Sequence, residues 1–219
     1  MRSLVDAVVL LSKGGYVMVP LMLCSVFSVT ILIERFFTIR RAQKDASQTV
    51  NDAQHAVRCN RMSEAAESLE RDDIPLTRVM AAGIKHAHLG EKGVERAMEE
   101  QAARETVELT RRFSVLDTII TIAPLLGLLG TCTGMIGAFH VIATRDGIST
   151  PTAITGGVAE ALIATATGLA IAIFTLIGHN HLQERVKNVL GEIEAAANGV
   201  LNAMSDLEEE PGEITRLSA

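Results

Sequence analysis

Three long stretches of the chain are almost free of charged residues. Residues 14–33 contain no charge across twenty positions, and residues 118–144 contain none across twenty-seven. In a third stretch, residues 147–183, Glu160 is the one charged residue. About 20 apolar residues are enough for a helix to cross a bilayer. We therefore expect three transmembrane helices, over residues 14–36, 113–144 and 151–180.

A soluble helical bundle fits this pattern poorly. Its helices would carry a polar face, with polar residues recurring every three or four positions. The run TIITIAPLLGLLGTCTGMIGAFHVIAT over residues 118–144 has no charged face of this kind. The fold class expected from the sequence is an all-α membrane protein whose long helices extend into a soluble helical domain.

The segments between the apolar stretches have the character of soluble helices. Residues 37–112 repeat apolar positions at three-to-four spacing, broken by Asp-Asp-Ile-Pro at 72–75 and by Gly90. From Gly93 to Pro124 the chain contains no Gly or Pro, so we expect the second membrane helix to begin well inside the soluble domain. Residues 181–219 continue the third helix as an amphipathic stalk and end in a tail. The apolar repeat of the stalk is Leu182, Val186, Val189, Ile193, Ala197, Val200 and Met204.

Positive charges near the spans predict the orientation. Loops rich in Lys and Arg stay in the cytoplasm. One side of the spans has nine such residues, namely Arg35, Arg40, Arg41, Lys44, Arg104, Arg111, Arg112, Arg185 and Lys187. The other side has three, namely Arg2, Lys13 and Arg145. We expect residues 37–112 and 181–219 in the cytoplasm, and residues 1–13 and 145–150 outside it. Lys13, Gly14 and Gly15 interrupt the apolar residues near the N-terminus and no small-x-small cleavage site follows, which favours an uncleaved first span over a signal peptide.

The composition excludes several classes of function. Aromatic residues make up only 3% of the chain and the net charge is −6, which disfavours a nucleic-acid binder. Three cysteines form no CxxC motif or disulfide framework. Three histidines, His140, His179 and His181, have no carboxylate or thiol at ligand spacing along the sequence. With no nucleotide-binding or nucleophile motif either, we expect no enzyme activity, no metal and no cofactor.

Small residues mark one face of the second and third spans. Gly127, Gly130, Gly134 and Gly137 recur at spacings of three, four and three, with Thr131 beside this stripe. Ala161, Thr165, Gly168 and Ala172 form a comparable stripe in the third span. Small residues let membrane helices approach closely, so we expect these faces to pack. Helix packing alone is sufficient to explain the glycines.

Glu160 is the candidate for chemistry. It lies nine residues into the third helix, about 14 Å at 1.5 Å per residue. A carboxylate at this depth is costly unless it is protonated, hydrated or paired. It should therefore face a cavity or a bundle interior, and it suits a group that takes up and releases protons. The alternatives are a structural acid bonded to a neighbouring Thr, or an acid that lies nearer the membrane interface than this depth suggests. On a helical wheel Thr167 lies near its face, whereas Thr165 lies about 140° away.

Two runs of sequence resemble a known family. IAPLLGLLGTCTGMIGAF at 122–139 and GGVAEALIATATGLAIAI at 156–173 are similar to the signature membrane helices of the MotA/TolQ/ExbB proton channel family, on its ExbB/TolQ branch. The resemblance implies a bacterial inner-membrane homo-oligomer, a pentamer, surrounded by lipid. Its second and third helices would line a pore around single-span ExbD/TolR-like subunits. Proton flow through a partner aspartate would then energise a TonB- or TolA-like protein.

The resemblance also assigns roles to individual residues. Glu160 matches the family's pore glutamate in its AEAL context, and Thr165 and Thr131 match the threonines of the proton pathway. Pro124 and Gly127 match its APxxGL segment. The family's common GTVWGI reads GTCTGM here.

Three other functions remain to be weighed. A flagellar-stator-like subunit would have four spans rather than three. A non-conducting membrane scaffold explains the glycine stripes but not an acid at depth. A small-solute transporter predicts repeated halves with broken helices, which this sequence lacks.

Overall fold

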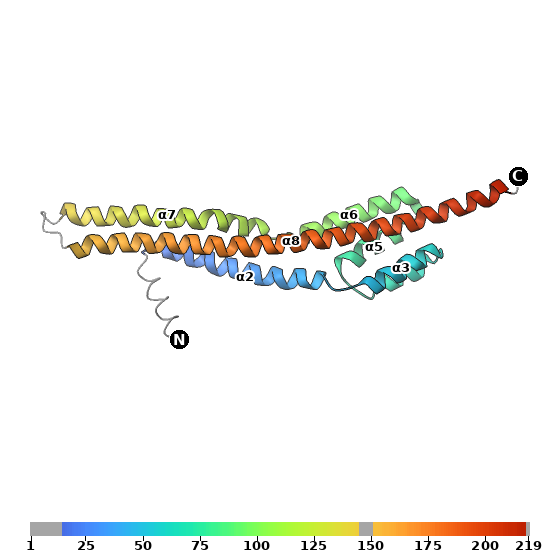
Figure 1. The fold of residues 1–219 in the computed structure, drawn as a ribbon, viewed down its shortest axis with the longest axis horizontal. Coiled ribbons are helices and arrows are strands. Elements are labelled where there is room, and N and C mark those ends of the chain that lie inside the picture. The colour runs from blue at the N-terminus through green and yellow to red at the C-terminus, as the bar shows by residue number, and fades with distance from the viewer. Residues whose placement is uncertain (1–14, 145–150, 218–219) are drawn as a thin grey trace. The chain divides into compact units, whose positions relative to one another are not determined.

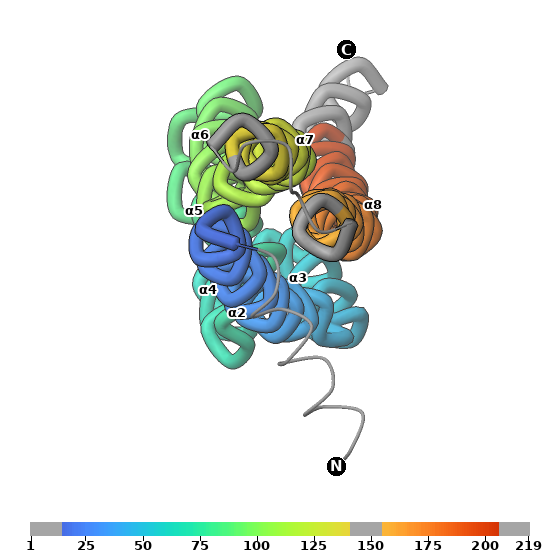
Figure 2. Tube along the Cα trace, turned by 90° about the vertical axis from the view of Figure 1, so that its left-hand side faces the viewer, coloured from blue at the N-terminus to red at the C-terminus, as the bar shows by residue number. Residues whose placement is uncertain are grey.

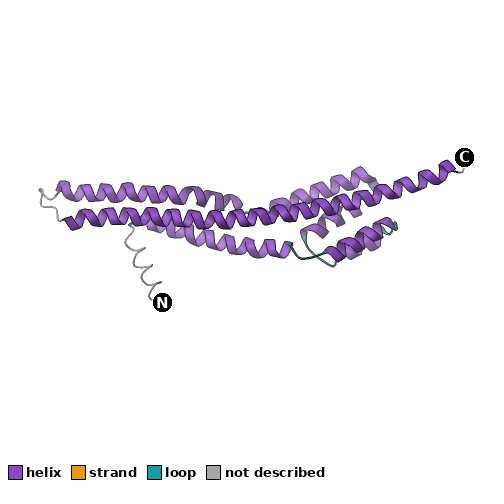
Figure 3. Ribbon diagram, in the orientation of Figure 1, coloured by secondary structure: helices purple, strands orange, loops and turns teal. Residues whose placement is uncertain are grey.

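A computed structural model describes residues 15–144 and 151–217. Every regular element in this part of the chain is a helix (Figure 3). The all-α fold class is therefore confirmed. The expected external segments, 1–13 and 145–150, lie outside the described residues.

The helices follow one another with short connections. Figure 1 labels most of them along the chain. Their bounds are α2 Met18–Ala42, α3 Ser47–Arg58, α4 Met62–Leu69, α5 Pro75–Lys85, the 3₁₀ turn η1 Ala87–Leu89, α6 Glu91–Leu109, α7 Phe113–Thr144 and α8 Pro151–Leu217. Three stretches are long and apolar enough to cross a membrane, within Met18–Ala42, Glu91–His140 and Thr155–Ser205. This confirms the expected number of candidate spans.

The chain divides into two compact units. Of the described residues, the apolar unit comprises 15–34, 112–144 and 151–181, and the polar unit comprises 35–111 and 182–217. Both α2 and α8 contribute to both units, because the division falls within each of these helices. α8 is one helix of 67 residues. Each unit has its own buried side chains, and each is described separately below.

The apolar unit is a three-helix bundle in which small side chains of α7 and α8 pack against larger apolar side chains of α2. The first part of α2 lies beside α7 and α8, which Figure 2 shows nearly end-on. Val17, Met18 and Leu21 are buried against Ala123 of α7 and against Ala164 and Ala172 of α8. Larger apolar side chains point outward from the same helices, including Phe27, Leu125, Leu128, Ile136, Leu162, Ile173 and Phe174. Large apolar side chains on the outside and small residues at the contacts between helices are typical of helices packed within lipid.

The expectation of one helix running from Glu91 into the second span is wrong. α6 ends at Leu109 and α7 begins at Phe113, with a turn between them. Arg112 in this turn has a φ of +68°, a left-handed conformation that no helix residue adopts. Its guanidinium forms an ion pair with Glu34 of α2. Thr110, Arg111 and Arg112 carry no strong helix-breaking signal, so the sequence does not predict this turn.

The polar unit packs short helices in chain order. α3 contacts α4, α4 contacts α5, and α5 contacts α6. Pro75 stands at the start of α5, where its missing N–H is not needed. Arg78 of α5 binds the buried Glu105 of α6 through two hydrogen bonds of 2.8 Å, Nε to Oε1 and Nη2 to Oε2. This pair raises the pKa of Arg78, so the guanidinium stays charged.

The stalk of α8 supplies the remaining wall of the polar unit. Its buried residues are Leu182, Val186, Val189, Ile193, Ala196, Val200, Ala203 and Met204. This set follows the apolar repeat read from the sequence, except that Ala196 is buried where Ala197 is half-buried. Gln54 of α3 packs directly onto Gly199 of α8, so the stalk and the short helices share one interior.

Candidate functional site around Glu160

Glu160 lies in the first part of α8 and is half-buried. Its carboxylate rests against Gly15, in the turn that precedes α2. A Cβ atom added at Gly15 would overlap Glu160 Oε1 and would lie 3.0 Å from Glu160 Cδ. Gly15 also has a φ of +71°, a conformation that glycine adopts without steric cost. The turn before α2 therefore forms part of the wall around the carboxylate.

No hydrogen-bond donor or ion-pair partner of the Glu160 carboxylate occurs within the described part of the chain. The nearby threonines are engaged elsewhere. Thr167 Oγ1 donates to the carbonyl of Ile163 at 2.8 Å, and Thr165 Oγ1 donates to the carbonyl of Gly127 at 2.9 Å. Among the described residues, Glu160 is therefore not a structural acid hydrogen-bonded to Thr165 or Thr167. A carboxylate without a partner among apolar helices is costly unless it faces water or another subunit.

Glycines bring α7 and α8 into close contact beside this site. A Cβ at Gly168 would overlap the carbonyl oxygen of Ala123 and lie 3.2 Å from Gly127 Cα. A Cβ at Gly134 would lie 2.9 Å from the carbonyl oxygen of Gly157. These neighbours are backbone atoms, which cannot move aside as a flexible side chain can. We call this contact the α7–α8 seam, formed by Gly127, Gly130, Gly134, Gly157, Ala161, Ala164, Thr165 and Gly168.

The seam includes some of the predicted packing residues and leaves others out. Gly130 faces Ala164, whose Cβ would be 2.5 Å from an added Cβ. Gly137, by contrast, has no heavy atom of the described chain within 4 Å of an added Cβ. Pro124 lies inside α7 and is half-buried. Thr131 Oγ1 donates to the carbonyl of Leu128 on its own helix at 2.6 Å.

Glu160, Thr165 and Thr131 consequently do not form one cluster within a single chain. Thr165 points from α8 to α7, whereas the Glu160 carboxylate reaches the turn before α2. This difference follows from their positions on the helical wheel, which are about 140° apart. The contact of Glu160 with Gly15 was missed by sequence reasoning. Only the Gly-Gly pair at the start of the first apolar run hinted at a special backbone there.

A second polar group is buried within the apolar unit, farther along α8. Ser28 and Thr175 share a hydrogen bond of 2.6 Å between their hydroxyl oxygens. One turn on, His179 Nε2 lies 3.3 Å from Asp117 Oδ1 of α7, and its ring packs edge-on against Phe113. His179 of α8 is therefore paired with a carboxylate from the neighbouring helix α7. No group of three or more potential metal ligands occurs among the described residues.

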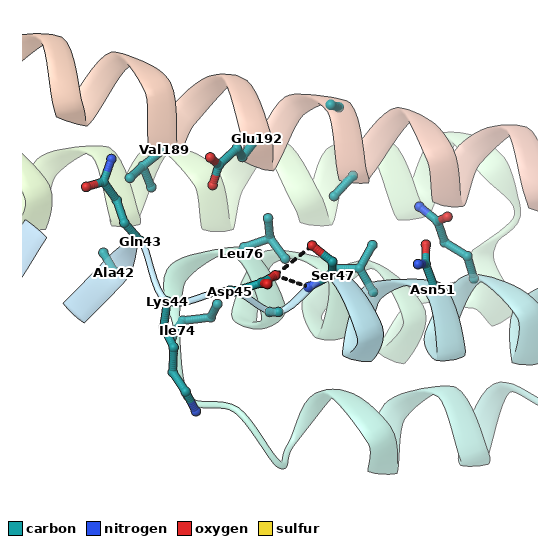
Figure 4. A pocket seen from close by; sticks show the side chains of 15 residues that line it. Ala42, Gln43, Lys44, Asp45, Ser47, Asn51, Ile74, Leu76, Val189 and Glu192 are labelled. Carbon is teal, nitrogen blue, oxygen red and sulfur yellow. Dashed lines mark hydrogen bonds between the residues drawn. The ribbon is translucent and has the colours of Figure 1, made fainter. Parts of the chain in front are cut away.

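The polar unit contains a cavity of about 520 Å³, shown in Figure 4. Val189 and Glu192 of α8 border it, and Asp45 and Ser47 stand on the connection from α2 to α3 and at the start of α3. Asp45 Oδ1 accepts hydrogen bonds from the Ser47 hydroxyl at 2.6 Å and from the Ser47 N–H at 3.0 Å. These bonds, the one from the hydroxyl first, lower the pKa of Asp45. The lining includes no Cys or His.

Comparison with known proteins gives a consistent result. Residues 71–195 match the model of the MotA/TolQ/ExbB proton channel family. A putative biopolymer transport protein ExbB-like 1 of Synechocystis sp. is 37% identical, in an alignment that covers 75% of this chain and 66% of the relative. A putative ExbB-like 3 protein of the same organism is 34% identical, with 76% and 80% covered. The Tol-Pal system protein TolQ of Pseudomonas aeruginosa is 29% identical, with 80% of each covered.

Proposed function

Because the chain belongs to the MotA/TolQ/ExbB proton channel family, we propose that it is the conducting subunit of a proton-driven motor in a bacterial inner membrane. Its family consists of membrane channel components rather than enzymes, and the chain is a multi-pass membrane protein with three candidate spans. In the proposal, Glu160 is the titratable group on the channel wall.

The position of Glu160 carries this proposal. It is the one charged residue of a stretch of 37 positions, residues 147–183, and it has no partner among the described residues. Hydrophobic helices tolerate such a group when it faces water or another subunit and marks an ion pathway. The tight α7–α8 seam gives the carboxylate a fixed support, since helices that cannot separate hold the start of α8 in place.

The proposed assembly needs more than one chain. In keeping with the family, several copies, five in our proposal, would surround single-span ExbD/TolR-like subunits that contribute a membrane aspartate. Each proton that crosses a potential of 100 mV releases about 2.3 kcal/mol, which is the energy available for motion of the partner. The motion would energise a TonB- or TolA-like protein. Thr131 and Thr165 would contribute hydroxyls to the proton pathway beside Glu160.

Purification from the native host tests the partner first. We expect a small single-span protein with an aspartate in its span to co-purify with this chain. Liposomes that contain this complex and a trapped pH indicator should then acidify when a K⁺ diffusion potential is applied. A chain that purifies without such a partner and conducts nothing would favour the membrane scaffold instead.

Glu160→Gln tests the role of the carboxylate within the same complex. The amide keeps the size of the side chain and removes its ability to bind and release a proton. We expect the variant complex to assemble as the wild type does and to lose proton flux by about 100-fold, the scale of losing a positioned proton-transfer group. Flux at the wild-type level in this variant would rule out the proposed role.

A further inference from the structure

We propose that Gly15 is a positioning residue for the Glu160 carboxylate, and this inference rests on the proposed function. The carboxylate occupies the space that the side chain of any other residue at position 15 would need. Gly15 thus forms one wall of the site, although it is far from Glu160 in sequence and has no functional group of its own.

The segment that bears Gly15 is anchored by its neighbours. Val17 and Met18 directly after it are buried in the core of the apolar unit, against Ala123 and Ala164. The N–H of Met18 donates to the carbonyl of Gly15 at 3.1 Å, so the turn is closed by its own backbone. Because the turn cannot easily move away from α8, a larger residue at position 15 would displace the Glu160 side chain instead.

Displacement of the carboxylate should change conduction strongly. A shift of about 1 Å in a reacting group can reduce a rate by up to about 100-fold. A Cβ that overlaps Oε1 requires a shift of that order. Gly15→Ala is therefore expected to lower proton flux of the complex by about tenfold or more, while the complex still assembles.

The control must separate displacement from backbone strain, because Ala at a positive φ is strained wherever it occurs. Gly90 in the polar unit supplies a strain control: its φ of +76° and ψ of −179° lie in a region that glycine alone adopts without cost, and an added Cβ meets no heavy atom of the described chain within 4 Å. Gly90→Ala carries the strain without the collision. We expect its flux to stay within about twofold of the wild type, as for a substitution that touches no functional group.

A shorter acid tests whether Gly15 acts through Glu160. Glu160→Asp withdraws the carboxylate by one methylene group, which gives room for a methyl group at position 15. In this background Gly15→Ala should cause less than about twofold further loss. A second readout does not depend on flux: the rate at which dicyclohexylcarbodiimide modifies Glu160, with Glu160→Gln as the unlabelled blank, should change severalfold in Gly15→Ala and not in Gly90→Ala.

Two results would overturn the inference. One is an equal loss of flux in Gly15→Ala and Gly90→Ala, which would assign the effect to strain. The other is an unchanged loss in the Glu160→Asp background together with an unchanged labelling rate, which would separate Gly15 from the carboxylate. If Glu160→Gln conducts like the wild type, the proposed function fails, and the labelling comparison still decides whether Gly15 positions Glu160.

Discussion

At the scale of single residues, the α7–α8 seam depends on glycines whose neighbours are backbone atoms. Gly168 faces the carbonyl of Ala123 and the Cα of Gly127, and Thr165 donates a hydrogen bond to Gly127 across the same contact. A side chain at position 168 must therefore push whole helices apart. Such a separation also breaks the Thr165 hydrogen bond, since its acceptor moves away with α7.

Gly168→Ala should consequently destabilise the chain by about 1–3 kcal/mol, the usual cost of overpacking a tight contact. Thermal unfolding in detergent, followed by circular dichroism, measures the change. Gly137→Ala is the matched control, because it adds the same methyl group to α7 where no atom of the described chain lies within 4 Å. Equal melting temperatures for the two variants would mean that the seam does not hold the helices together.

At the scale of elements, the turn between α6 and α7 separates the two units of the chain. Arg112 adopts a φ of +68° in this turn. For a residue with a Cβ atom, this conformation lowers the free energy of unfolding by roughly 1–2 kcal/mol. Its half-exposed ion pair with Glu34 offsets a part of this cost, because exposed pairs contribute about 0–1 kcal/mol. The turn thus stores strain that a change of residue can reveal.

We expect Arg112→Gly to be more stable than Arg112→Ala by about 1 kcal/mol. Both substitutions remove the ion pair with Glu34, so only the backbone conformation distinguishes them. Chemical denaturation of both variants measures the difference. Were α6 and α7 one continuous helix in the membrane, the order would reverse, since Gly is about 1 kcal/mol worse than Ala inside a helix.

At the scale of the whole molecule, some features were predictable from sequence and others were not. The three spans were, because crossing lipid demands about 20 consecutive apolar residues, and such a run is visible without any knowledge of contacts. The contact of Gly15 with Glu160 and that of Asp117 with His179 were not, because each joins residues on different elements. The spacing of apolar residues along the chain gives no information about such a pairing. The turn at Arg112 was missed for the same reason.

Orientation in the membrane is a property of the whole chain that its distribution of charge predicts. The excess of Lys and Arg beside residues 37–112 predicts that the polar unit lies in the cytoplasm. Cys59 at the end of α3 is exposed, so it reports on the side that this unit occupies. Ser149→Cys, in the connection between the second and third spans, reports on the opposite side.

With Cys24 and Cys132 replaced by Ser, a membrane-impermeant maleimide should label Cys59 in inverted vesicles but not in intact spheroplasts. A variant that has Ser149→Cys as its only thiol, with Cys59 also replaced by Ser, should give the reverse pattern. Labelling of Cys59 in intact spheroplasts would place the positive loops outside and refute the predicted orientation. The membrane potential would still drive protons inward, so in that case they would enter from the side of the polar unit, and the proposed pathway would have to be redrawn.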